Sequence, residues 1–406
     1  MPVPSATQQV PEPQATAPPR PFADGGVAAI AWLGRMRAQA PVLEGGYGMY
    51  QVFGHDDVLA VLSDPVRFSS DLSVLMPGME SFCEGKLTMT DPPAHRKLRT
   101  LVGRAFTARR ISRLEPRIRQ LAAELVDGVD GRIELVDQVA HPLPVILIAE
   151  LLGIPVTDRA SFRDWADRLI TMQVDSPGDP AFMAKVQETL QGMDGYLAEQ
   201  CADRRRTPRD DLLSDLLAAE VDGERLTERN VLDTAALLLL AGHITTTLLI
   251  GNLVTALTAE TDALAAVRAD PTLAEAAVDE ALRYRPSFPS ASRVSTENVT
   301  VGGCRITAGR FVMAWLLSAN HDERRYLHPD RFDLHRGQDG RHLTFGHGIH
   351  FCLGAPLARL EATVVLQVLL ERFAELAPDP SNPVEFYESG VLGPRRLPLL
   401  VNAVRS

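Results

Sequence analysis

The sequence has 406 residues, of which 52 are acidic and 41 are basic, so its formal net charge is −11. Apolar residues make up 45 % of the chain and charged residues 23 %, as in a soluble globular protein with a large core. The negative charge argues against a protein that binds nucleic acid through a basic face. Four cysteines, at positions 83, 201, 304 and 352, lie far apart without a CxxC pair, which argues against a disulfide scaffold or a zinc ribbon.

The N-terminal segment differs in composition from the rest of the chain. Its first twenty residues contain six prolines and no apolar run, which is unlike a signal peptide. Residues 1–21 are therefore expected to form a disordered tail, and the protein is expected in the cytoplasm. No linker is visible after this tail, so residues 22–406 are expected to form a single domain.

Helical periodicity dominates the remaining chain. Helices are expected at 26–40, 55–63, 94–106, 115–129, 144–152, 158–172, 180–206, 209–220, 228–259, 261–269, 271–284 and 353–375. Strands are expected at 47–53, 299–301, 304–306 and 311–317, with paired strands at the C-terminus and a hairpin turn at Gly302-Gly303. The pattern therefore predicts a mostly α fold with small β-sheets.

The helix expected at 228–259 raises the question of a membrane span. Residues 234–259 carry no charged side chain, and their length suffices to cross a bilayer. However, the segment contains His243, Asn252 and six threonines, and it lies between amphipathic segments. These polar residues favour a helix buried on all sides in a soluble fold.

The strongest local motif is the decapeptide FGHGIHFCLG at 345–354. Cys352 stands at the start of a helix, where the dipole and free N–H groups favour a thiolate. Gly346 and Gly354 leave room for a flat ligand beside the sulfur, so the loop suits an axial haem ligand. The residues alone leave open a buried free cysteine, a catalytic cysteine, or a zinc site with His347 and His350.

Two further patterns are weak on their own. Glu280 and Arg283 form an i,i+3 pair that occurs on many exposed helices. The sequence AGHITTT at 241–247 interrupts a Leu-rich helix with residues of low helix propensity. The threonine hydroxyls there either bond to their own helix or line a groove beside a reaction centre.

Taken together, these motifs resemble the bacterial cytochrome P450 family, the haem-thiolate monooxygenases with a triangular-prism fold. The decapeptide matches the family signature FGxGxHxCxG at every fixed position. The resemblance implies that Cys352 is the axial ligand of a haem b, and that Phe345, Gly346, Gly354 and Ala241 border the haem.

The resemblance also assigns a set of charged residues. The segment TDPPAHRKLR at 90–99 is similar to the family segment that holds a haem propionate, which implies that His95, Arg99, Arg293 and His350 are propionate partners. Glu280 and Arg283 match the family ExxR motif. In this interpretation Arg331, in the sequence HPDRF, completes a buried triad that braces the Cys loop.

The oxygen-binding motif departs from the family pattern at one position. The resemblance implies that Thr245 orients the distal oxygen, with Thr246 beside it. Ile244, however, occupies the position where the family has an acid. The expected proton donors are therefore water or a substrate hydroxyl acting with Thr245, and the pocket wall is expected to be more apolar.

The expected activity is hydroxylation or epoxidation of a mid-sized to large apolar secondary metabolite, such as a macrolide or other polyketide. The reaction would use O2 and two electrons from a ferredoxin and its reductase. Oxidative coupling, peroxide-driven oxidation and non-catalytic haem binding are the alternatives. The protein is expected to act as a monomer, without a nucleic-acid or membrane partner.

Three groups of surface and pocket residues complete the expectations. The substrate pocket is expected to contain Leu75, Met76, Met79, Leu238, Phe288, Ser290, Ala291 and Val391. A mobile lid is expected near residues 172–180. A basic patch for an acidic ferredoxin is expected at Arg96, Lys97, Arg104, Arg109, Arg110 and Arg113.

Overall fold

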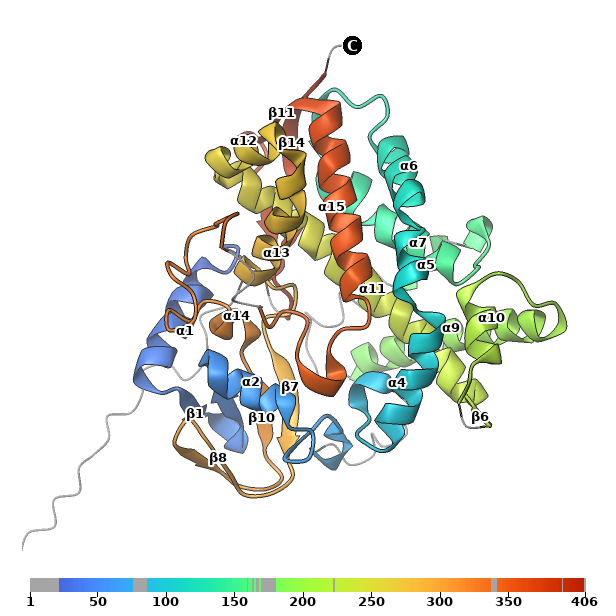
Figure 1. Ribbon diagram of the computed structural model, residues 1–406, viewed down its shortest axis with the longest axis vertical. Coiled ribbons are helices and arrows are strands. Elements are labelled where there is room, and N and C mark those ends of the chain that lie inside the picture. The colour runs from blue at the N-terminus through green and yellow to red at the C-terminus, as the bar shows by residue number, and fades with distance from the viewer. Residues whose placement is uncertain are drawn as a thin grey trace, which may run out of the picture.

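The computed structural model describes residues 22–75, 86–158, 160–162, 164–165, 168, 180–221, 223–336, 342–388 and 390–404. The larger part of the fold is helical (Figure 1). Its helices are α1 (Val27–Gln39), α2 (His55–Ser63), α4 (Ala94–Ala105), α5 (Ala108–Ser112), α6 (Glu115–Leu125), α7 (Pro142–Leu151), α9 (Pro180–Arg206), α10 (Leu212–Ala218), α11 (Glu228–Ala259), α12 (Thr261–Ala269), α13 (Ala274–Tyr284), α14 (Leu316–Ala319) and α15 (Ala355–Arg372).

The strands form several small sheets rather than one large one. They are β1 (Val42–Glu44), β2 (Tyr50–Val52), β3 (Phe68–Ser69), β4 (Gly131–Glu134), β5 (Glu220–Val221), β6 (Glu224–Arg225), β7 (Ala291–Ser295), β8 (Val299–Val301), β9 (Cys304–Ile306), β10 (Phe311–Ala314), β11 (Phe373–Pro378), β12 (Glu385–Phe386), β13 (Pro394–Arg396) and β14 (Pro398–Ala403). The largest sheet has the order β1-β2-β10-β7-β3, in which only β2 and β10 are parallel. This sheet lies with α1 and α2 at one corner of the molecule in Figure 1.

Helix α11 is the central element of the helical part. Thr227 begins it with a capping box, in which its hydroxyl accepts a hydrogen bond from the backbone N–H of Asn230. The most apolar window of the helix has a mean hydropathy of 1.8, and 72 % of that window is buried. The helix is therefore a core helix, as predicted, although it is not buried on every side.

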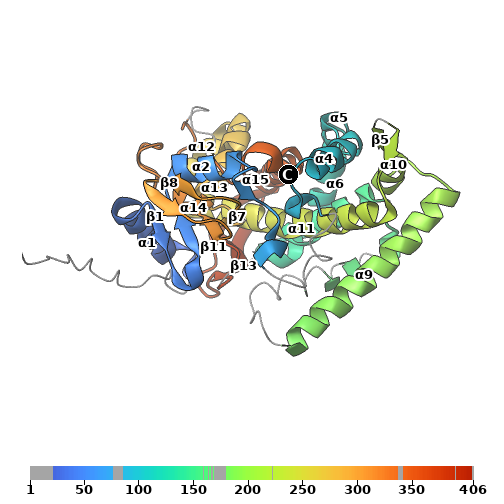
Figure 2. The ribbon, with the colours of Figure 1, turned by 90° about the horizontal axis from the view of Figure 1, so that it is seen from below.

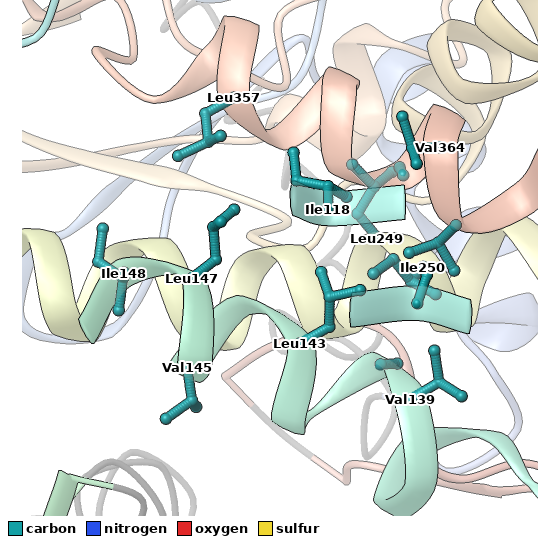
Figure 3. Close-up of a cluster of buried hydrophobic side chains, with 14 of the residues drawn as sticks. Ile118, Val139, Leu143, Val145, Leu147, Ile148, Leu249, Ile250, Leu357 and Val364 are labelled. Atoms are coloured by element: carbon teal, nitrogen blue, oxygen red, sulfur yellow. The ribbon is translucent and has the colours of Figure 1, made fainter. Parts of the chain in front are cut away.

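The main hydrophobic core lies where α11 packs against α7, α13 and α15, and where α6 packs against α15 and α7. Figure 3 shows Ile118 of α6, Leu143 of α7, Leu249 of α11 and Val364 of α15 at this junction. Because α15 packs on α11, the loop that precedes α15 is held at a fixed place relative to the middle of α11.

Most predicted elements are confirmed, and the bounds of α2, α9 and α11 match the expected ones. The predicted strand 311–317 is wrong at its end, since β10 stops at Ala314 and α14 follows. A short apolar run has no periodicity that separates a strand from a buried helix. Strand β7 is not among the predicted strands. It pairs with β10 and β3, and β3 lies far from it in the sequence. The tail at 1–21, the lid at 172–179 and the pocket residues Met76 and Met79 lie outside the described residues.

Candidate active site

The Cys loop, residues 342–354, runs into the N-terminus of α15. Its backbone closes on itself, because the N–H of Cys352 donates to the carbonyl oxygen of Phe345 at 2.9 Å. Gly348 has φ +68° and its absent Cβ would lie 3.0 Å from the Leu62 oxygen of α2, so only glycine fits there. The loop therefore lies against α2 on one side, while the Arg99 side chain of α4 donates to the Phe351 carbonyl at 2.7 Å on another.

The Cys352 thiol is half-buried. Burial raises its pKa, and this effect outweighs the backbone N–H groups of Gly354 and Ala355 and the positive charges of Arg99 and Arg359. The N–H groups at the helix N-terminus lower the pKa, as expected from the sequence, but burial has the larger effect. A bound metal cation would supply the missing stabilisation of the sulfur anion. Gly354 has no side chain, and a Cβ at this position would lie 3.9 Å from the Cys352 Sγ. Glycine therefore leaves the sulfur accessible on this side.

A cluster of basic side chains gathers beside the Cys loop. His95 and Arg99 lie one turn apart on α4, His350 comes from the Cys loop, and Arg293 comes from β7. The rings of His95 and His350 have centroids 4.3 Å apart. Burial lowers the pKa of His350 to about 3, and His95, Arg293 and Arg99 repel its charged form further. The four residues predicted as propionate partners are thus brought together.

This basic cluster forms no ion pair with an acid among the described residues, although Asp91 lies near enough to favour the charged forms of His95 and Arg293. The Nε2 atoms of His95 and His350 are buried without a hydrogen-bond partner there. Asp91, the nearby acid, already accepts hydrogen bonds from the Ser69 hydroxyl and the Ser70 N–H. Buried donors and two guanidinium groups that form no ion pair with a described acid fit the carboxylates of a haem, whose propionates would satisfy them.

The residues on α11 divide between open space and the protein interior. Leu238, Ala241 and Thr245 share one face of the helix, where Ala241 is exposed and the other two are half-buried. The Thr245 hydroxyl donates to the Ala241 carbonyl oxygen at 2.6 Å. Thr246 is buried on another face. The exposed face at the centre of a buried helix marks the open side of the site.

Ile244 does not lie on that open face. It is buried in a small apolar cluster with Leu248 and Val391, against which Tyr387 packs. The expected change to the pocket wall is therefore absent, because the side chain points into the protein. Val391 is 1 % exposed and lies behind the wall rather than on it.

The other predicted pocket residues differ in exposure. Phe288, on the loop between α13 and β7, is 36 % exposed, which is high for a large apolar side chain. The rest of the described set is half-buried, namely Leu75, Ser290 and Ala291. Phe345 and Gly346 of the Cys loop are also half-buried.

The predicted triad is wrong in its third member. Arg283 binds Glu280 through two hydrogen bonds of 2.8 Å, as expected for a buried bidentate pair. The second arginine on Glu280 is Arg336, whose Nε lies 3.0 Å from Oε1. The Arg331 side chain is exposed, and only its carbonyl oxygen takes part, by accepting from Arg283 and Arg336. Both arginines stand in one loop, and no local pattern in the sequence separates them.

The triad fastens the Cys loop through Asn320. Arg283 donates to the Asn320 carbonyl at 2.8 Å, and the Asn320 side chain accepts from the Leu343 N–H and donates to the Thr344 hydroxyl. The Thr344 hydroxyl in turn donates to the Leu282 carbonyl at 2.6 Å. The ion pair of α13 therefore positions the start of the loop that carries Cys352.

Comparison with known proteins agrees with this site. Residues 265–401 match the family model for cytochrome P450. The chain is 45 % identical to the erythromycin C-12 hydroxylase of Saccharopolyspora erythraea over 93 % of this chain and 95 % of that protein. It is 44 % identical to the cyclomarin C epoxidase CymV of Salinispora arenicola over 92 % and 96 % of the two chains.

A solved structure shares the same fold over nearly the whole length. The ligand-free structure of cytochrome P450 TbtJ1 superposes with a TM-score of 0.88 at 50 % identity, covering 94 % of this chain and 99 % of that one. Identity of this extent over the whole fold, together with the Cys loop and the basic cluster, assigns the family. The chain belongs to the cytochrome P450 family and is a haem-thiolate monooxygenase.

Proposed function

We propose that the protein hydroxylates or epoxidises a mid-sized to large apolar secondary metabolite of the macrolide or polyketide class. The observation that carries the site assignment is the position of Cys352 beside four basic side chains that form no ion pair with a described acid, two of which have a buried nitrogen without a hydrogen-bond partner. The substrate class is supported by the 45 % identical relative named as an erythromycin hydroxylase. The relative named as an epoxidase supports the second outcome.

The bound haem would supply the oxidising chemistry, in which O2, two electrons and two protons yield one oxygenated product and one water. In this proposal the Cys352 sulfur binds the iron, and His95, Arg99, Arg293 and His350 hold the propionates. Gly346 and Gly354 keep side chains away from the ring, while Phe345 and Ala241 border it. The protein thereby fixes the cofactor and excludes water from its sulfur side.

Proton delivery would depend on Thr245. Its hydroxyl already donates to the Ala241 carbonyl, so its oxygen is free to accept a hydrogen bond from a water or a substrate hydroxyl. Ile244 has no proton to give and is buried in an apolar cluster, and Thr246 is buried away from the open face. A proton would therefore reach the site through Thr245 from the solvent or substrate side.

The carbon-monoxide difference spectrum of the reduced protein tests the ligand assignment. The wild type should show the band of a thiolate-ligated haem, and Cys352→Ser should lose that band while retaining the fold. Cys201→Ser, at a buried cysteine in the helical core, is the matched control and should keep it. A band that survives in Cys352→Ser would show that another group binds the iron.

Product analysis by mass spectrometry tests the substrate class. The enzyme, a ferredoxin and its reductase would be incubated with macrolides, other polyketides and small terpenoids under the same conditions. A product with one added oxygen from the first two groups supports the proposal. Turnover confined to the small terpenoids would refute it, and turnover with hydrogen peroxide alone would support the peroxygenase alternative.

We propose an acidic ferredoxin as the electron donor, bound at part of the predicted basic patch. Arg104, Arg109, Arg110 and Arg113 line a surface cleft of about 550 Å³. Within the patch, Lys97 pairs with Glu224, Arg110 pairs with Asp215, and Arg104 donates to the Glu220 carbonyl. Arg96, Arg109 and Arg113 form no ion pair with any described residue and are exposed, so they are the side chains available to a partner.

Replacing Arg109 and Arg113 by Gln should raise the KM for ferredoxin about tenfold at low salt, because long-range attraction to an acidic partner is lost. The difference from the wild type should shrink as salt is added, since exposed charges are screened. Arg305→Gln, at an exposed arginine on β9, serves as the control and should leave this KM unchanged. An unchanged KM in the double variant would place the docking surface elsewhere.

We further propose that the protein is cytoplasmic and acts as a monomer whose single domain is formed by residues 22–406. Size-exclusion chromatography tests the monomeric state.

A further inference from the structure

Two adjacent carboxylates of α13 point to different parts of the molecule. Glu280 binds Arg283 and Arg336, whereas Asp279 faces α15 and the Cys loop. Consecutive residues on a helix are rotated by about 100°, which explains why the two side chains serve different partners. Asp279 accepts a hydrogen bond of 2.7 Å from the Nε of Arg359, and it lies 3.7 Å from the Nε2 of His342. The described structure thus has a second brace on the Cys loop beside the triad.

This second brace ends on the aromatic ring of Phe345. The guanidinium carbon of Arg359 lies 4.7 Å from the centroid of that ring, within the range of a cation–π contact. The ring also lies near His342, with centroids 5.7 Å apart, and near Phe351, at 6.3 Å. Because the Phe345 carbonyl accepts the Cys352 N–H, the guanidinium, the ring and the cysteine form one chain of contacts.

Arg359 is the positive member of this group. The His342 side chain is 8 % exposed, and its burial lowers the pKa of the imidazole, which is therefore neutral at pH 7. Burial raises the pKa of Asp279, but the hydrogen bond from Arg359 and the nearby His342 imidazole outweigh it, and the pKa lies below its ordinary value. Asp279 therefore stays ionised and holds the guanidinium in place. Arg359 is 36 % exposed, so its charge is only partly screened by solvent.

We propose that Arg359 is a positioning residue that sets the reduction potential of the haem iron. Held by Asp279, it fixes the Phe345 ring and keeps one positive charge next to the Cys loop. A nearby positive charge favours the state of the iron that carries one more electron. This inference rests on the assignment of Cys352 as the iron ligand in the proposed function.

Redox titration of the purified holoenzyme provides the test, with the carbon-monoxide difference spectrum recorded for each variant. Arg359→Met should shift the one-electron equilibrium about tenfold toward the oxidised iron, which corresponds to a potential about 59 mV lower. Arg359→Lys keeps the charge but loses the planar stacking, and its shift should stay below about threefold. Arg119→Met is the matched control and should leave the potential unchanged. Arg119 is 39 % exposed and pairs with Glu371, near the far end of α15 from Cys352.

Asp279→Asn tests whether the carboxylate acts through Arg359. The carboxylate balances part of the Arg359 charge, so the potential of this variant should rise, by less than Arg359→Met lowers it, and the potential of the double variant should lie between those of the two single variants. The Asp279→Asn variant also tests the inference if Arg359→Met fails to bind haem. If Arg359 had only a structural role, Arg359→Met and Arg359→Lys would both lower the unfolding temperature, and the reduction potential would not shift more in Arg359→Met than in Arg359→Lys.

Two results would overturn the inference. The first is an Arg359→Met or Asp279→Asn potential equal to that of the wild type in protein that retains the thiolate-type band. The second is a wild-type protein without that band, which would contradict the ligand assignment as well. The first result leaves the proposed function intact, so the two failures are distinguishable.

Discussion

Position 244 shows how much a single side chain depends on its surroundings. The residue stands in the oxygen-binding motif, yet Ile244 packs against Leu248 and Val391 inside the protein. Its neighbour Thr245 faces the open side and bonds to the carbonyl one turn earlier. The two consecutive positions therefore have separate roles, one in packing and one at the site. In the proposed function, proton delivery depends on the hydroxyl of Thr245.

Thr245→Ala should uncouple electron use from product formation. Without the hydroxyl, the protons needed for oxygen insertion arrive less efficiently, and at least about fivefold less product should form per electron pair. The lost product should appear as hydrogen peroxide, which an oxidase assay measures alongside product. Thr255→Ala is the control, because Thr255 makes the same hydrogen bond to the carbonyl four residues earlier on α11. Equal coupling in both variants would mean that protons take another route.

At the scale of elements, the Cys loop is positioned by α13 through two neighbouring carboxylates. Glu280 reaches the loop by way of Arg283 and Asn320, and Asp279 reaches it by way of Arg359. Besides its internal hydrogen bonds, the loop therefore depends on helices that precede and follow it. A change in either brace is expected to alter the cofactor site without touching the cysteine.

Arg336→Met should destabilise the protein far more than Arg331→Met. Arg336 donates to Glu280 and to three backbone carbonyls, so its removal should cost about 2–3 kcal/mol, while Glu280 keeps Arg283 and the Asp333 N–H as partners. The Arg331 side chain is exposed, so its loss should change the free energy of unfolding by no more than about 0.5 kcal/mol. Chemical denaturation and haem retention measure both variants. The reverse order would restore Arg331 as the third member of the triad.

At the scale of the whole molecule, Glu361 is a core acid that forms no ion pair with any described residue. Glu361 on α15 is 2 % exposed, its Oε2 has no hydrogen-bond partner among the described residues, and burial raises its pKa well above the ordinary value. A carboxyl whose pKa is raised in the folded state stabilises below its unfolded pKa, and this contribution is lost as the pH rises. The acid is therefore a source of instability at neutral and alkaline pH.

Glu361→Gln should accordingly become more stabilising as the pH rises from about 4.5 to 8. The difference in unfolding free energy between variant and wild type should grow steadily with pH, because the wild type alone must then bury a charge or keep a proton that the unfolded chain releases. Thermal or chemical unfolding at several pH values measures this difference. Glu371→Gln, at an exposed acid on the same helix, should show no comparable growth. A constant difference across the pH range for Glu361→Gln would argue against a buried, neutral carboxyl.

The sequence by itself determined the features that depend on neighbours along the chain. Apolar periodicity and the capping pattern at Thr227 define α11, and the fixed glycines around Cys352 define the Cys loop. Local rules suffice there because hydrogen bonds within a helix or a turn join residues a few positions apart. The likeness of these motifs to the P450 family also carried the correct family, cofactor and basic cluster.

Only the tertiary structure decided which side chains meet across distant segments. In the structure Arg336, and not Arg331, pairs with Glu280. Ile244 is buried in an apolar cluster, and the Arg359 guanidinium lies over the Phe345 ring. The structure also pairs β7 with β10 and β3. For Glu280, both Arg331 and Arg336 stand in the same loop, and the packing decides which side chain is buried beside the carboxylate. A long-range partner is fixed by the packing of whole elements, which leaves no local pattern for the sequence to reveal.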